Sequence, residues 1–162
     1  MNDKLADLWH AIRRCDLAGI RETSCALKLR QVRDDEGLPV VLAALAMTST
    51  SDQVVRTLLL LGADANDHDA ITGKTALHIA CGRQSLSLVQ MLLDHNADVH
   101  ARDAHGNTPL CDAVFTFQSD LGIIRLLLES GASADAANLH GVSPYGLAEQ
   151  CKLADVIALM RR

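Results

Sequence analysis

The chain has 162 residues, 49% of them hydrophobic and only 2% aromatic, so it can bury a sizeable core built mainly from Leu, Ala, Val and Ile. Its net charge of −5 and its lack of a basic block argue against nucleic acid or an anionic membrane as the main partner. The charged start and the short apolar runs predict no signal peptide and no transmembrane helix. Five cysteines, an odd number without a Cys-x-x-Cys pair, favour a reducing compartment, so we expect a cytoplasmic protein.

Two short phrases recur along the chain and divide it into five segments. Residues 1–33 keep only a helical skeleton around Leu8 and Ile20, and residues 34–69 run from an Asp-Asp-Glu-Gly phrase to a Gly-Ala-Asp phrase. Residues 70–102 hold the clearest copy, in which Gly73-Lys-Thr-Ala-Leu-His-Ile-Ala is followed by His-Asn-Ala-Asp-Val-His. Residues 103–137 repeat this copy, with Gly106 standing 33 residues after Gly73, and residues 138–162 hold a truncated copy. A fixed period of this length predicts a repeat architecture.

The combination of a Gly-x-Thr-Pro-Leu-His-x-Ala phrase, an apolar second stretch and a Gly-Ala-Asp-x-Asn phrase resembles the ankyrin repeat. The resemblance covers nearly the whole chain. It implies an all-α fold: an ankyrin-repeat solenoid of stacked helix-turn-helix units with β-hairpin or loop fingers. Because one such unit cannot bury its own apolar face, we expect residues 1–162 to form a single domain of five repeats, the outer two degenerate.

The repeats also contain surplus residues, since 36 residues separate Gly37 from Gly73 and 35 separate Gly106 from Gly141. Most of them fall in Ser- and Thr-rich stretches at 48–51 and 116–119, where a turn between the two helices of a repeat belongs. The remaining one lies near residues 67–69, in a connecting finger. Insertions placed in loops leave the stacking core intact.

Residues in the repeated phrases have clear helix-terminating roles. Thr75 is expected to cap a first helix, with His78 three residues later within reach of its hydroxyl, and Pro109 suits a first helical turn. Gly62 and Gly131, with Asn96 in the middle copy, are expected to end second helices in the left-handed conformation. One alanine per repeat lets packed helices approach closely; these alanines are Ala11, Ala44, Ala80, Ala113 and Ala148.

Three local patterns resemble catalytic motifs but fit the repeat better. Gly73-Lys-Thr75 lacks the first glycine and the preceding strand of a phosphate-binding loop. Ser143 lies in a Gly-x-Ser-x-x-Gly stretch that is one residue too long for a nucleophile elbow, so we interpret it as a helix cap. His78 and Cys81 have the spacing of a base and a thiolate, but the repeat register buries both. We therefore predict no enzyme activity and no cofactor.

Histidines near aspartates suggest a second possible class of function. His95, His100 and His105 recur every five residues, and His68 lies between two aspartates. This spacing does not place three ligands on one helix face, so we assign no metal ligand. A metal- or thiol-dependent sensor that uses the finger histidines is retained as the alternative function.

Ankyrin repeats generally bind proteins through finger tips and the concave face of the first helices, and the resemblance implies the same here. Both phenylalanines of the chain fall at the end of one first helix, and aromatic and Arg residues are frequent interface hot spots. The alternative for Phe117 is a local plug. The predicted partner-binding residues are Arg14, Met47, Ile71, Lys74, Arg83, His105, Phe115, Phe117, Leu139 and His140.

The resulting prediction is a non-enzymatic protein-protein interaction module that acts as an inhibitor, an immunity protein or an adaptor. Its partner is expected to be another protein, with no role for nucleic acid or membrane. We expect a monomer, although the apolar residues Met47, Phe115 and Leu139 would also suit a homodimer. A structural spacer that binds nothing tightly is the remaining alternative.

Overall fold

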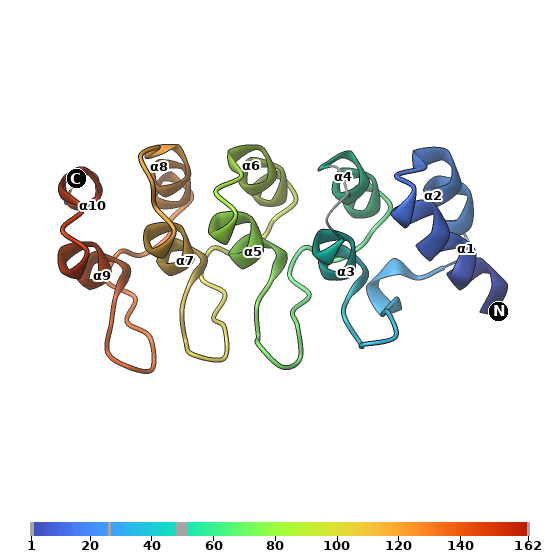
Figure 1. The fold of residues 1–162 in the computed structure, drawn as a ribbon, viewed down its shortest axis with the longest axis horizontal. Coiled ribbons are helices and arrows are strands. Elements are labelled where there is room, and N and C mark those ends of the chain that lie inside the picture. The colour runs from blue at the N-terminus through green and yellow to red at the C-terminus, as the bar shows by residue number, and fades with distance from the viewer. Residues whose placement is uncertain (1, 26, 48–51, 162) are drawn as a thin grey trace. The chain divides into compact units, whose positions relative to one another are not determined.

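The computed structural model describes residues 2–25, 27–47 and 52–161, and it is all-α, as predicted (Figure 1). The described residues contain no β-strand, and an isolated antiparallel bridge joins Arg33 and Pro39. The helices are α1 (Asn2–Arg13), α2 (Leu17–Ser24), a 3-10 turn (Leu29–Gln31), α3 (Val40–Ala46), α4 (Asp52–Leu60), α5 (Ala76–Gly82), α6 (Leu86–Asp94), α7 (Pro109–Phe115), α8 (Gly122–Glu129), α9 (Pro144–Gln150) and α10 (Ala154–Met160).

The chain divides into two compact units, Met1–Ala70 and Ile71–Arg162. In the first unit, α1 packs against α2, α3 against α4, and α2 against α4. Its fully buried side chains come from all four helices and include Leu8, Ile12, Ile20, Leu42 and Leu58. This unit therefore contains two helix pairs around an aliphatic core.

The second unit contains three helix pairs in two rows (Figure 1). The first helices of the pairs, α5, α7 and α9, pack side by side, and the second helices, α6, α8 and α10, form the other row. A long loop precedes the first helix of each pair and extends away from the helices (Figure 1), and we call these loops fingers. Fully buried leucines and isoleucines fill the space between the rows: Leu77, Leu88, Leu92, Leu110, Ile124 and Leu127.

Several helices begin or end where the sequence indicated, with Pro109 in the first turn of α7. Thr75, Thr108 and Ser143 occupy the N-cap positions of α5, α7 and α9, and the Ser143 hydroxyl accepts a hydrogen bond of 3.0 Å from the N–H of Gly146. Left-handed residues follow α4, α6 and α8, with φ of 94° at Gly62, 61° at Asn96 and 94° at Gly131. The five predicted packing alanines are all buried.

The surplus residues behave as loops where the structure describes them. Residues 116–119 connect α7, which ends at Phe115, to α8, which begins at Gly122. The other predicted insertion, at residues 48–51, lies outside the described residues.

Candidate partner-binding surface

Two fingers of the second unit contain the same turn, built by a short acidic or amide side chain. The Oδ1 atom of Asp103 accepts hydrogen bonds from the N–H groups of His105 and Asn107, at 2.9 and 2.8 Å. The Oδ1 atom of Asn138 repeats this pattern with the N–H groups of His140 and Val142, at 2.9 and 3.0 Å. These bonds satisfy backbone donors at the tip without secondary structure, so the finger tips have a defined conformation.

Neighbouring fingers of the second unit are joined by further hydrogen bonds. The N–H of Ala104 donates to the carbonyl of Thr72 at 2.8 Å, and the N–H of Leu139 donates to the carbonyl of His105 at 3.0 Å. The Arg102 guanidinium donates to the carbonyls of Gly106 and Ala137, at 2.9 and 2.8 Å. The fingers therefore form a connected row.

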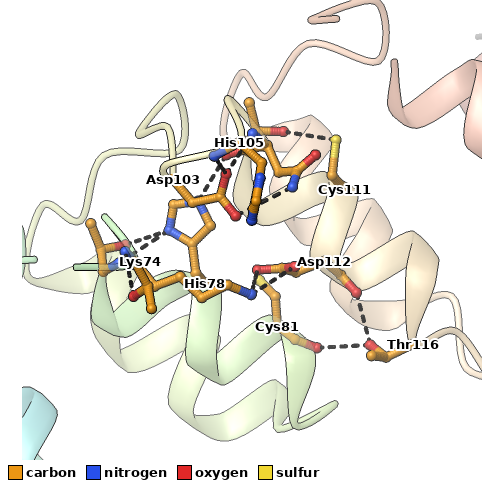
Figure 2. Close-up of polar contacts among 12 residues, drawn as sticks. Lys74, His78, Cys81, Asp103, His105, Cys111, Asp112 and Thr116 are labelled. Carbon is orange, nitrogen blue, oxygen red and sulfur yellow. Dashed lines mark hydrogen bonds and ion pairs between the residues drawn. The ribbon is translucent and has the colours of Figure 1, made fainter. Parts of the chain in front are cut away.

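His78 links α5 to the next repeat (Figure 2). Its Nδ1 atom lies 3.2 Å from the backbone nitrogen and 2.9 Å from the hydroxyl of Thr75, and its Nε2 atom lies 3.1 Å from the carbonyl oxygen of Asn107. Because a carbonyl oxygen only accepts, Nε2 carries the proton and Nδ1 accepts from Thr75. The Thr75–His78 contact that the sequence predicted is confirmed.

Neither His78 nor Cys81 has the ionisation that thiol catalysis requires. Burial lowers the pKa of His78, against the opposing effects of the Asn107 hydrogen bond and of Asp112 and Asp103. Burial, reinforced by Asp112, raises the pKa of Cys81 well above its usual range. The pair therefore stays neutral at physiological pH, which agrees with its interpretation as a packing feature.

Lys74, one of the predicted partner-binding residues, is held by the protein itself. Its ammonium group lies 3.0 Å from a carboxylate oxygen of Asp112 on α7 (Figure 2). The Lys74 side chain is 39% exposed and that of Asp112 15%, so the pair lies at the edge of the surface between two repeats. This ion pair links Lys74, just before α5, to α7 of the next repeat.

The end of α7 is fixed by a residue that the sequence analysis did not single out. Gln84, in the left-handed conformation with φ of 55°, donates from its side chain to the carbonyls of Cys81 and Ala113 and to the hydroxyl of Thr116, at 3.2, 3.1 and 2.9 Å. A glutamine after an α-helix carries no specific sequence signal. These bonds hold the segment that bears Phe115.

Phe115 is 74% exposed and stands at the edge of a groove of about 370 Å³ beside α7 and α9. Apolar contributions to the groove come from Val142 and Leu147, and polar ones include His140 and Gln150. The remaining lining residues are Asn107, Cys111, Asp112 and Asn138. An exposed aromatic ring beside a groove with both apolar and polar walls is typical of a binding surface.

The structure brings together only part of the predicted set. Phe115 and His140 line the groove, and the ring of His105 lies 6.2 Å from that of His140, centre to centre. Arg14 and Met47 belong to the first unit. The exposed residues of the set are Arg14, Ile71, Arg83, His105, Phe115, Leu139 and His140, and the half-buried ones are Met47, Lys74 and Phe117.

Two properties of the described residues bear on other functions. Within the described ranges, no group of three or more His, Cys, Asp or Glu side chains is placed to hold a metal ion. No helix in the described part of the chain is long and apolar enough to span a membrane.

Comparison with known proteins agrees with the fold. A family model described as ankyrin repeats in three copies matches residues 41–138. The chain is 45% identical over 87 residues to the Regulatory protein NPR6 of Arabidopsis thaliana and 49% identical over 76 residues to the BTB/POZ domain and ankyrin repeat-containing protein COCH of Pisum sativum. These matches cover 53% and 46% of this chain, but only 18% and 16% of the two relatives. Since the family model covers more than half of the sequence, the chain belongs to the ankyrin-repeat family.

Proposed function

We propose that this chain is a non-enzymatic interaction module that binds a protein segment on the groove beside Phe115. The observation that carries the proposal is the 74% exposure of Phe115 at the edge of that groove, in a chain with only two phenylalanines. Leaving a large aromatic side chain in water forgoes the stabilisation that burial provides, about 2 to 3 kcal/mol. A partner that covers the ring recovers it.

The groove suits an apolar anchor flanked by polar groups. Its volume of about 370 Å³ accommodates one or two side chains of a bound segment, beside the ring of Phe115 and against Val142 and Leu147. Asp112 already pairs with Lys74, whereas the exposed side chains of His140 and Gln150 lie at the groove with hydrogen-bonding capacity. We expect these two residues to orient the bound segment.

The remaining predicted contacts extend this surface. In the second unit, Ile71 and Leu139 lie on fingers and are 87% and 77% exposed. Arg83 follows α5, and Phe117 is half-buried beyond α7. We propose that these residues contribute secondary contacts around the Phe115 groove, and that Arg14 and Met47 contact the partner from the first unit.

We further propose that binding serves regulation in the cytoplasm, by occluding a partner or tethering it as an adaptor. Support comes from relatives whose names describe a regulatory protein and BTB/POZ domain and ankyrin repeat-containing proteins. The chain spans less than a fifth of the length of these relatives, so their wider activities are not carried over.

The test is affinity capture from native cell extract with quantitative mass spectrometry, comparing the wild type with Phe115→Asp. The matched control is Leu60→Asp, since Leu60 is 68% exposed on α4 and is not one of the residues that line the groove. We expect a protein that is captured by wild type and control and lost with Phe115→Asp. For that protein, the Kd should rise about thirtyfold, as for loss of an interface hot spot.

Folding is checked by thermal melts, which exposed substitutions should shift little. Equal capture of every protein by all three baits would refute the groove as the binding site and favour the structural spacer.

A further inference from the structure

Two histidines from adjacent repeats face each other at the finger tips of the second unit. His105 follows the Asp103 turn and His140 follows the Asn138 turn, at equivalent positions of their fingers. Their ring centres are 6.2 Å apart and the ring planes are tilted by 33°. The sequence analysis grouped His105 with His95 and His100, which are close in sequence, and it did not pair His105 with His140.

The backbone beneath these rings is fixed. The N–H of Leu139, the residue before His140, donates to the carbonyl of His105 at 3.0 Å. A second bond joins the same two fingers: the side-chain amide of Asn138 donates to the side-chain oxygen of Asn107 at 2.7 Å. The two Cα positions are thus tied together by bonds that do not use the imidazoles, so only side-chain rotation is needed to change the distance between the rings.

This distance suits two imidazoles that share one metal ion. With a metal–nitrogen bond of about 2.0 to 2.1 Å, two rings on one metal have centres about 4.5 Å apart at a right angle at the metal, about 5.2 Å at a tetrahedral angle and about 6.4 Å in a linear arrangement. The observed 6.2 Å lies near the upper end, so a side-chain rotation that brings the rings about 1 Å closer gives a tetrahedral site. Both side chains are exposed, and within the described residues the hydrogen bonds of these two histidines use the histidines' backbone atoms and not their rings. The ring nitrogens are therefore available to a ligand.

We propose that His105 and His140 form a two-histidine site for a divalent transition metal of the nickel, copper and zinc class. Imidazole is a preferred ligand of these ions. The two rings supply two ligands, and water or a side chain of another molecule completes the coordination. The site is distinct in kind from a closed structural zinc site, which needs four protein ligands.

Three other histidines in the described part of the chain differ from this pair: His78, His95 and His100. His78 uses both ring nitrogens in bonds to Thr75 and Asn107 and is fully buried. The Nδ1 atom of His95 donates to the carbonyl of Met91 at 2.8 Å. His100 is exposed, and its backbone N–H donates to the side chain of Asp98.

In the pair of His105 and His140, the first ring to bind holds the metal beside the second. The second metal–nitrogen bond therefore forms intramolecularly and strengthens binding.

The experiment titrates Ni²⁺ into the full chain, produced without a histidine tag, using calorimetry and NMR. We expect one site per chain, and the paramagnetic ion should broaden the ring signals of His105 and His140 before those of the other histidines. The single variants His105→Ala and His140→Ala should each weaken binding at least about tenfold, since either one breaks the chelate. The matched control His100→Ala, which also removes one exposed histidine, should leave the affinity unchanged.

The proposal is overturned if either single variant binds Ni²⁺ within about twofold of wild type, or if His100→Ala weakens binding equally. It is also overturned if the ring signals of His105 and His140 stay sharp while the exposed thiols of Cys25 and Cys151 take up the ion. Thermal melts without metal show that each variant is folded. The result is independent of whether Phe115 binds a protein.

Discussion

At the scale of single residues, His78 is a buried neutral link between repeats. It is fully buried, its Nδ1 atom accepts from Thr75, and its Nε2 atom donates to the carbonyl of Asn107. A protonated ring would lose the bond that Nδ1 accepts and would place a charge in an apolar interior. The fold therefore depends on the neutral form of this residue.

This dependence predicts that stability falls on mild acidification. Because burial lowers the pKa of His78 below the unfolded value of 6.5, the unfolded state binds a proton that the native state does not. The contribution of His78 is fully present above pH 6.5 and is lost as the pH falls from there toward the folded-state pKa, with a slope of at most about 1.4 kcal/mol per pH unit. Urea unfolding between pH 7.5 and 5 measures this slope.

The variant His78→Gln isolates the effect, since glutamine keeps a donor and an acceptor but does not titrate. It should be less stable than wild type at pH 7.5 and show a flatter profile between pH 7 and 5. Asp103 does not interfere: burial would raise its pKa, but hydrogen bonds from Asn107 and His105 outweigh this and lower it, so its contribution is lost only at more acidic pH. An identical slope in wild type and variant would contradict the assignment.

Of the contacts around His78, the sequence predicted only the one with Thr75. Thr75 and His78 belong to one helical turn, so their contact follows from the spacing alone. The bond from His78 to Asn107 crosses 29 residues, and the Gln84 bonds to Ala113 and Thr116 cross 29 and 32. Such contacts depend on how repeats stack, which no local pattern specifies.

At the scale of elements, three fingers share a side-chain turn whose residues are visible in the sequence. An Asp or Asn stands three residues before the finger glycine at Asp34, Asp103 and Asn138, and each side chain accepts two backbone N–H groups. The sequence analysis noted the glycines but not this partner residue. Ala70 holds the equivalent position in the second finger, so this finger lacks the bonds.

Two finger glycines with similar backbone angles should respond differently to alanine. Gly73 and Gly141 have φ of 68° and 74°. A Cβ atom at Gly73 would lie 2.8 Å from the backbone nitrogen of Ala104, whereas a Cβ at Gly141 would meet nothing within 4 Å. Gly141→Ala should therefore cost only the left-handed penalty of about 1 kcal/mol, and Gly73→Ala should cost roughly 1 to 3 kcal/mol more because backbone must move.

Equilibrium unfolding of both variants measures this difference. The N–H of Ala104, which donates to Thr72, should lose protection against hydrogen exchange in Gly73→Ala and keep it in Gly141→Ala. Equal destabilisation by the two substitutions would show that the contact between fingers carries no measurable energy.

At the scale of the whole molecule, the repeat period predicted a repeat architecture, and the resemblance to ankyrin repeats implied the helix pairs and the all-α class, which the structure shows. Ankyrin membership is confirmed by the family match. The expectation of a single five-repeat domain over 1–162 stays a prediction. The period could not reveal how evenly stability is distributed, because this depends on contacts such as caps and buried polar groups that differ between copies.

Residues of the first unit lack several stabilising features found in the second. Pro39 occupies the N-cap of α3 without a side-chain hydrogen bond, whereas Thr75 and His78 form a capping box at α5. Among the described residues, the buried hydroxyl of Ser24 has no hydrogen-bond partner, which costs about 1 to 3 kcal/mol. The ion pair Arg30–Asp64 of the first unit, with side chains 72% and 32% exposed, contributes little.

We therefore expect the first unit to open more readily than residues 71–137. Hydrogen exchange measured by mass spectrometry should show amides of α3 and α4 exchanging about tenfold to a hundredfold faster than those of α5 and α7, which corresponds to about 1.4 to 2.8 kcal/mol. Ser24→Ala should narrow this gap, because it removes the unpaired buried hydroxyl. Protection of α3 equal to that of α5 would mean that the missing cap and the Ser24 hydroxyl are compensated by the apolar core of α3, in which Val40, Val41 and Leu42 are all buried.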